Sequence, residues 1–270
     1  MEALSAPMGY STHGQRTGGR LRVFDARHLD RIYNTAAMRL QRARTRQLLE
    51  TRPDDRVMDL GCGAGHLTAE LAVDVGDGWV IGLDQQPGML AAAAVKAGVA
   101  DNCSLVLADA TSLPLGDNVC DRLVAVQVLE YVPDVSGALA EAFRVLAVGG
   151  RAVLVDTDWR SCVWHTDDRE RTDAVLRAWE SHFVHPHLPA QLPGLAEASG
   201  FAGAEVHAMP VVETQAQADA YSLGMAATIE RFVKQHEPGV VDGWREDVRT
   251  QALRGTYFFS LTRFAVVLTR

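Results

Sequence analysis

The chain lacks the cysteine patterns that build disulfide frameworks or zinc sites. Its 270 residues include four cysteines, and no two of them form a C-x-x-C pair. Each cysteine stands in or beside an apolar run, where a free thiol behaves as a small hydrophobic group. No segment resembling a secretory signal opens the sequence. These absences predict a reduced, cytoplasmic protein without disulfide bonds.

Long apolar runs and an excess of positive charge are also absent. No apolar stretch reaches the roughly 18 residues that a membrane-spanning helix requires, so we expect no membrane span. Asp and Glu outnumber Lys and Arg by 34 to 26, which gives a formal net charge of −8. General nucleic-acid binders usually carry a basic surface, so we expect no nucleic-acid partner. The sequence does not set the oligomeric state and is compatible with a homodimer.

A glycine-rich loop is the most informative feature that is present. Residues 57–65 read V-M-D-L-G-C-G-A-G, an apolar run with one acidic residue followed by three glycines at alternate positions. Glycine has no Cβ, so such a loop can turn tightly and bring bare backbone against a ligand. The helix expected directly after it offers free N–H groups to an anion. The pattern therefore predicts a site for a nucleotide-like ligand that carries an anionic group.

Two cofactor classes compete for this loop. Nicotinamide and flavin dinucleotides use G-x-G-x-x-G, whereas the spacing here is G-x-G-x-G with His66 next. Asp59 would repel a pyrophosphate and suits an ammonium group, as in the methionine part of S-adenosylmethionine. The stretch resembles the D-x-G-x-G-x-G motif of class I S-adenosylmethionine-dependent methyltransferases. The resemblance implies cofactor contacts from Asp59, Gly61, Cys62, Gly63 and Gly65.

Strand and helix patterns alternate up to about residue 160. Such alternation predicts an α/β fold with a parallel sheet covered on both faces. Gly149-Gly150 is expected to form the turn before the fifth strand. We expect strands at 56–60, 79–83, 104–107, 122–126 and 152–156, helices at 65–75, 87–98 and 135–147, and a short helix at 110–113.

The flanking segments follow other patterns. Residues 1–27 show little periodicity and are expected to be flexible, and a helix is expected from 28 to 50. Later helices are expected at 167–184, 190–199, 216–236 and 242–254, and later strands at 205–212 and 257–268. The resemblance implies a Rossmann-like, seven-stranded, mostly parallel sheet with an antiparallel last strand. It also implies one catalytic domain, 28–270, whose core spans 50–160 and whose substrate-side helices and lid span 160–256.

Other strand ends supply further cofactor candidates. Asp84 ends the second expected strand, where a carboxylate can bind both ribose hydroxyls; a helix cap is the alternative. Gln85 follows it, and Met89 lies one turn further, either against the adenine or in the core. Ligands of open α/β sheets bind at the carboxyl ends of the strands, so these residues should converge with the loop. The resemblance adds adenine contacts from Asp109 and Ala110, and methionine contacts from Gln127 and Val128.

No single residue stands out as the general base. His165 is the best candidate, because imidazole titrates near neutrality, although it also reads as a helix-entry residue. Asp158 and Glu130 follow the fifth and fourth strands, and Glu130 reads equally as a base or a cap. The related motif often has histidine where Tyr131 stands here, which removes one base. These acidic residues, with Asp156, would suit a basic acceptor.

The histidines at 182, 185 and 187 form an H-x-x-H-x-H run, a spacing that can bind a transition metal. No neighbouring cysteine or carboxylate completes a site, so we expect no metal. The sequence predicts an S-adenosylmethionine-dependent methyltransferase that moves a methyl group to a small-molecule acceptor by in-line displacement. It is most similar to methyltransferases of ubiquinone and menaquinone biosynthesis and of natural-product pathways. A nicotinamide-dependent oxidoreductase and a catalytically silent cofactor-binding subunit are the alternatives.

Overall fold

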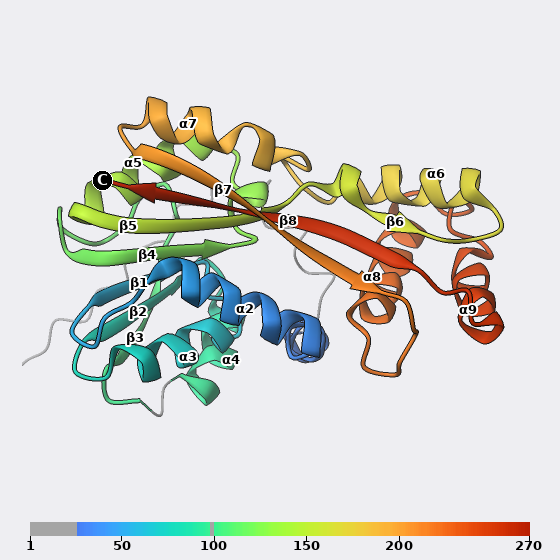
Figure 1. Cartoon of the computed structure of the whole chain (residues 1–270), viewed down its shortest axis with the longest axis horizontal. Helices are drawn as coiled ribbons and strands as arrows, with labels where there is room; N and C mark the ends of the chain where they lie inside the picture. The colour runs from blue at the N-terminus through green and yellow to red at the C-terminus, as the bar shows by residue number, and fades with distance from the viewer. Residues whose placement is uncertain (1–25, 98–99) are drawn as a thin grey trace, which may run out of the picture.

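The polypeptide forms a mixed sheet flanked by helices, with a helical lobe at one end of the molecule (Figure 1). The computed structural model describes residues 26–97 and 100–270. Most of the segment 1–27, predicted to be flexible, therefore lies outside the described residues. In the described part of the chain the sheet has eight strands in the order β3-β2-β1-β4-β5-β8-β6, and β7 also pairs with β8.

Five parallel strands form the part of the sheet that positions the site. Their short apolar runs are buried against helices, as parallel strands require. β1 lies between β2 and β4, so strands are added in opposite directions on its two sides. Such a switch point is where ligands of open α/β sheets bind. All five predicted strands are confirmed: β1 (Arg56–Leu60), β2 (Trp79–Asp84), β3 (Cys103–Leu107), β4 (Cys120–Val126) and β5 (Leu146–Thr157).

The predicted antiparallel last strand is confirmed as β8 (Phe259–Thr269), which lies between β5 and β7 (Ala202–Glu213). The two-residue strand β6 (Val163–Trp164) pairs with the start of β8 and was not predicted, because two residues carry no periodic signal. The Rossmann-like class therefore holds, with one short strand added.

Helices cover both faces of the sheet. α2 (Ala36–Leu49) and α3 (His66–Val75) bury one apolar core against it, and α5 (Val135–Val145) and α7 (Leu192–Ala198) bury another on the opposite face. α4 (Pro87–Lys96) follows β2 and packs beside β3. The helices predicted at 65–75, 87–98, 135–147 and 190–199 are thus confirmed within a few residues.

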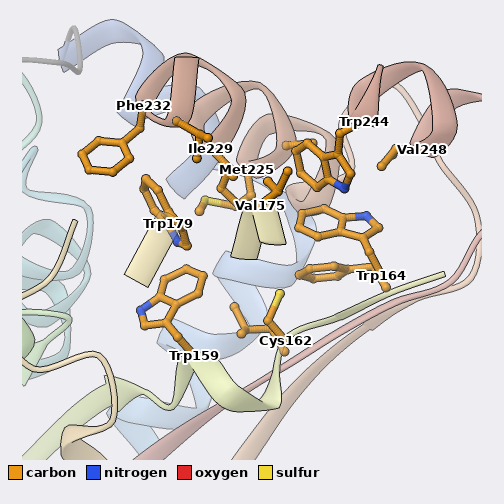
Figure 2. Close-up of a cluster of buried hydrophobic side chains, with 14 of the residues drawn as sticks. Trp159, Cys162, Trp164, Val175, Trp179, Met225, Ile229, Phe232, Trp244 and Val248 are labelled. Atoms are coloured by element: carbon orange, nitrogen blue, oxygen red, sulfur yellow. The ribbon is translucent and has the colours of Figure 1, made fainter. Parts of the chain in front are cut away.

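A third core fills the helical lobe. It lies among α1 (Ala26–Tyr33), α6 (Arg169–Glu180), α8 (Tyr221–His236), α9 (Trp244–Arg254) and the first residues of β8. Figure 2 shows its tryptophans gathered between these helices. β8 contributes to all three cores: Phe259 to this one, Val266 to the second and Ala265 to the first. The strand therefore ties the lobe to the sheet.

Three local predictions were wrong. The helix expected at 28–50 is two helices, because Thr35 is extended (φ −70°, ψ 161°). The helix expected at 110–113 is a turn, in which the Asp109 carboxylate accepts from the backbone and hydroxyl of Thr111. Gly149-Gly150 lies inside β5 rather than before it, and the Gly149 N–H donates to the carbonyl of Arg270 (2.8 Å). The first two differences come from local polar contacts that compete with regular structure, and the third comes from backbone pairing of β5 with the C-terminal residue.

None of the described helices combines the length and the apolar character needed to cross a bilayer. All four cysteines carry free thiols, and three of them are buried.

Candidate functional site

The glycine loop follows β1 and adopts the left-handed conformations that explain its composition. Gly61, Gly63 and Gly65 have φ values of +70°, +53° and +78°, a region that side chains rarely tolerate. A Cβ on Gly61 would lie 2.3 Å from a methyl of Val128, and one on Gly65 would lie 2.9 Å from the Cα of Ala93. A Cβ on Gly63 would meet nothing within 4 Å. Gly63 is therefore the glycine whose bare face is open to a ligand.

Asp84 holds this loop against the end of β2. Its carboxylate accepts from the N–H of Gly63 (3.0 Å) and from that of Gln86 (2.8 Å), at the start of α4. Burial raises the pKa of Asp84, and the backbone hydrogen bonds oppose this. The contact with the Gln86 N–H matches the predicted cap, and the ribose contact stays a prediction. A carboxylate has about four acceptor positions, so capacity remains for ligand hydroxyls.

Asp59 lies beneath the loop rather than in it. The side chain is 2% exposed and accepts from the Thr68 hydroxyl on α3 (2.6 Å). Burial, with the nearby Asp84 carboxylate, raises the pKa of Asp59 to about 7. The structure therefore gives Asp59 a bracing contact between β1 and α3. Cys62, in the loop, is buried, and its N–H donates to the carbonyl of Leu83 (2.8 Å).

The candidates for the adenine side lie at the ends of β2 and β3. Asp109 is exposed, and the N–H of Ala108 donates to the carbonyl of Asp84 (3.1 Å), which joins the two strand ends. Met89 is partly exposed and belongs to none of the three cores. Gln85 is exposed and Ala110 is half-buried. The structure brings these residues to the same edge of the sheet as Gly63.

Gln127 follows β4 in a strained conformation. Its φ is +56°, and a non-glycine residue in this region marks a site where the surroundings impose the backbone. The side-chain amide donates to the Thr157 hydroxyl (3.3 Å), while Oε1 is buried with no partner among the described residues. Val128 packs on Gly61, as the clash geometry shows. Both residues therefore lie at the loop, and Gln127 has an unused acceptor there.

Two buried carboxylates continue the site beyond Gln127. Glu130 is fully buried and Asp156 is 1% exposed. Asp156 accepts from the Glu130 backbone (3.4 Å), and the Trp159 indole donates to Glu130 Oε2 (3.3 Å). Burial raises the pKa of Glu130 to about 7, although the charge of Arg263 opposes this. Burial and the Glu130 charge raise that of Asp156 well above its usual range.

Arg263 is the functional candidate that the sequence analysis missed. It lies on β8, is fully buried, and donates to neutral groups from three other elements. Strand periodicity carries a signal for it, because the buried Leu261 and Ala265 lie two positions to either side. The partners of its guanidinium are Thr157 (3.4 Å), the Met38 sulfur (2.8 Å), the Gln41 amide oxygen and the Tyr221 hydroxyl (2.7 Å).

The structure places His165 away from the glycine loop and gives Asp158 two charged partners. His165 is exposed beyond β6, where its N–H donates to the carbonyl of Phe258, at the end of β8 farthest from the glycine loop (Figure 1). Asp158 is held by Arg160 (2.9 Å) and His187 (3.3 Å). His165 therefore lies away from the glycine loop, and the assignment of the base to Asp158 or Glu130 stays a prediction.

The histidine run forms no metal centre in the described chain, where no group of three metal-ligating side chains was found. His182 stacks on Trp179, with ring centroids 4.5 Å apart. His187 lies between Asp158 and Glu180. These contacts explain the two histidines as packing and surface residues.

Comparisons with known proteins agree with this arrangement. A family model described as "Methyltransferase domain" matches residues 58–154. An uncharacterized 37.1 kDa protein of a Streptomyces fradiae transposon is 32% identical over 89% of this chain and 70% of its own length. The demethylmenaquinone methyltransferase of Mycolicibacterium vanbaalenii is 40% identical over 44% of this chain. The match spans about half, 49%, of that relative.

Solved structures show the same fold. The Haemonchus contortus phosphoethanolamine N-methyltransferase 2, solved with S-adenosyl-L-methionine, superposes with a TM-score of 0.59. It is 16% identical, and the match covers 91% of this chain and 56% of that one.

The glycine loop and the acidic strand ends lie together at the carboxyl edge of a parallel sheet, where open α/β sheets bind their ligands. Residues 58–154 match a methyltransferase domain, and the chain has the fold of class I S-adenosylmethionine-dependent methyltransferases. The residues at the loop are compatible with S-adenosylmethionine, because Gly63 leaves an open face and Gln127 an unused buried acceptor. The similarities found give no support to a nicotinamide-dependent oxidoreductase or a silent subunit.

Proposed function

We propose that the protein transfers a methyl group to a small, largely apolar molecule bound between the sheet edge and the helical lobe. The observation that carries this is the convergence of Gly63, Asp84, Asp109 and Gln127 at one edge, directly beside the aromatic lobe. The resemblance to a demethylmenaquinone methyltransferase supports an apolar acceptor.

The proposed cofactor contacts follow from the geometry. Gly63 offers bare backbone to the methionine part, and Gln127 offers its free Oε1 to the amine. Asp84 holds the ribose hydroxyls with its remaining lone pairs, and Asp109 and Met89 flank the adenine. Asp59 braces the loop through Thr68 and makes no direct contact in this proposal.

The bound cofactor supplies an electrophilic methyl group on a positively charged sulfur. The chain has to align the acceptor in line with that methyl, at about 3 Å, and exclude water. The lobe suits both tasks. Tyr221 is 1% exposed and Trp159 is 5% exposed, so these aromatic side chains of the lobe are shielded from water.

The site assignment is tested by calorimetric titration with S-adenosylhomocysteine. Asp84→Asn and Asp109→Asn should each weaken binding by about tenfold, the equivalent of one lost hydrogen bond to a charged group. Asp101→Asn is the matched control, since Asp101 is an exposed carboxylate before β3. Unchanged affinity in Asp84→Asn would remove Asp84 from the site. Equal losses in Asp101→Asn would assign the effect to net charge.

The one-domain division at 28–270 and the cytoplasmic location are also proposals. The free thiols support a reducing compartment. The compatibility with a homodimer and the lack of a nucleic-acid partner stay predictions.

A further inference from the structure

The outer edge of β7 is open. In the described part of the chain β7 pairs with β8 alone (Figure 1), and Pro210 lies opposite Thr262. The N–H of Thr262 donates to the Ser161 hydroxyl (2.8 Å), which in turn donates to the Thr262 carbonyl (3.3 Å). Ser161 stands just before β6, on the side of β8 away from β7. Because pairs in an antiparallel ladder alternate between bonded and non-bonded, the main chain of Pro210 points away from β8.

The same alternation sets the direction of the residues two positions apart along β7. The N–H and C=O groups of Val206, Ala208 and Val212 also point to the outer edge. None of these groups has a hydrogen-bond partner among the described residues. The side chains are exposed too, Val206 by 49% and Val212 by 55%. The edge therefore offers backbone donors and acceptors beside small apolar side chains, which is a template for another strand.

Two irregularities limit the length over which another strand can pair. Between Ala202 and Glu205 the register with β8 shifts by one residue, and Gly203 there has a φ of +66°. Such a β-bulge ends the regular edge on one side. On the other side Pro210 has no N–H to donate. Pairing is therefore confined to the few residues around Val206.

The charges on β7 indicate that the other strand is β7 of a second copy. Antiparallel two-fold pairing centred on Val206 places Glu205 of each copy opposite His207 of the other. Within one chain the His207 Nε2 lies 3.0 Å from Glu205 Oε1, so both side chains are on the same face. The Glu205 side chain is 66% exposed and can reach a second copy. A carboxylate and an imidazole directly across a ladder attract each other, here at two symmetric places.

Other centres on the same strand give less favourable charge pairs. Centring on His207 puts two imidazoles face to face. Centring on Met209 puts Glu205 opposite Glu213, and like charges directly opposite are destabilising. The charge pattern therefore selects Val206 as the centre.

Pro210 selects the same register. Centring on Ala208 would put Pro210 opposite Val206, where its missing N–H costs a bond within the ladder. Centring on Val206 instead puts it opposite Ala202, where the bulge has already ended the ladder. Both irregularities of the edge are thus placed outside the paired stretch.

We propose that two copies of the protein form a two-fold dimer in which their β7 edges pair antiparallel, centred on Val206, and join the two sheets into one. The N–H of each Val206 donates to the Val206 carbonyl of the other copy. The contacts between Glu205 and His207 flank this centre on both sides. β4, β5 and β8 separate β7 from β1, so the glycine loop stays accessible in the dimer. The proposal does not depend on the methyltransferase function.

Sedimentation velocity of the full chain, from low to high micromolar concentration, tests the association. The wild type should shift from monomer towards dimer as its concentration rises. A wild type that stays monomeric throughout would overturn the proposal, and would leave the edge to a strand of some other protein.

Val206→Pro removes the central donor from the edge. The N–H of Val206 points away from β8, so the monomer loses no internal hydrogen bond. The dimer loses two, and its dissociation constant should rise by about tenfold or more. Val212→Pro is the matched control, because Val212 also points outward and is exposed but lies outside the paired stretch. It should leave the constant unchanged, and equal effects of the two prolines would overturn the proposal.

Charge variants test the pairing without a proline in the strand. His207→Glu should weaken the dimer by about tenfold, because it places two carboxylates opposite each other at both ends of the ladder. The double variant Glu205→His, His207→Glu restores opposite pairs and should recover the wild-type dissociation constant. A double variant that associates no better than His207→Glu would contradict the register.

Cross-linking reports the centre of the interface directly. Two Val206 residues that exchange hydrogen bonds would have Cα atoms about 5.5 Å apart, within the range that a disulfide spans. Oxidised Val206→Cys should therefore give a covalent dimer on a non-reducing gel, whereas Val212→Cys should stay a monomer. The native thiols are present in both variants and cancel in the comparison. A covalent dimer from Val212→Cys alone, or from neither variant, would overturn the proposal.

Discussion

At the scale of single residues, the loop glycines have different roles: Gly65 permits close packing, and Gly63 leaves an open face. Gly65→Ala places a Cβ against the backbone of Ala93 at a positive φ, so it should lower the free energy of unfolding by about 2–3 kcal/mol. Gly63→Ala has room and should lower it by only about 1 kcal/mol. Its methyl should nevertheless occupy the open face and weaken S-adenosylhomocysteine binding. Urea unfolding and calorimetry measure the two effects; strong cofactor binding by Gly63→Ala would contradict the assignment.

Asp59 should give the protein a pH-dependent stability. Burial raises its pKa from 3.8 to about 7, so between these values the folded state holds a proton that the unfolded chain releases. The free energy of unfolding should therefore fall as the pH rises from about 4 to about 7. Other carboxylates titrate there too, so the measurement is the difference from Asp59→Asn. The variant should show a flatter profile by urea titration, and identical slopes would refute this.

The sequence was least informative about which individual residues lie at the site. Glu130 was named from its place after a strand, and the structure keeps it at the site. His165 was favoured for its chemistry alone, yet β6 carries it to the far end of β8. Arg263 was missed because an arginine in a strand normally marks the solvent side. Which contacts a side chain finds depends on helices distant in sequence, here α2 and α8.

At the scale of elements, helix α6 begins with a capping aspartate. Asp168 accepts from the N–H of Arg171 (2.9 Å) and pairs with the Arg171 side chain (3.0 Å), and Asp168→Ala removes both contacts. The variant should lose about 1 kcal/mol of stability by urea unfolding. Cofactor affinity should be unchanged, because α6 belongs to the helical lobe. A loss of S-adenosylhomocysteine binding would show that the lobe also shapes the cofactor side.

Elements were largely predictable from sequence. Short, continuous apolar runs between helical segments located all five parallel strands, because a strand buried on both faces requires such a run. Boundaries depended on contacts that periodicity does not record. The break before α2 at Thr35 and the strand start at Leu146 are examples.

At the scale of the whole molecule, we expect the sheet and the helical lobe to unfold together, because β8 contributes to the cores of both. Four of the five tryptophans (159, 164, 179 and 244) lie in the lobe, so fluorescence reports that region. S-adenosylhomocysteine at about 100 times its Kd should add about 2.7 kcal/mol of stability. The fluorescence and circular-dichroism transitions should then shift to higher temperature by the same amount. A fluorescence transition whose midpoint temperature does not change with the ligand would show that the lobe unfolds by itself.

The central claim is that the cofactor rests on Gly63, with its ribose at Asp84 and its adenine at Asp109. A crystal structure of the complex with S-adenosylhomocysteine tests this most directly. The account predicts the amino-acid end against Gly63 and Gln127 and both ribose hydroxyls on the Asp84 carboxylate. A nucleoside bound at any other edge of the sheet, or one that leaves Asp84 untouched, would contradict it.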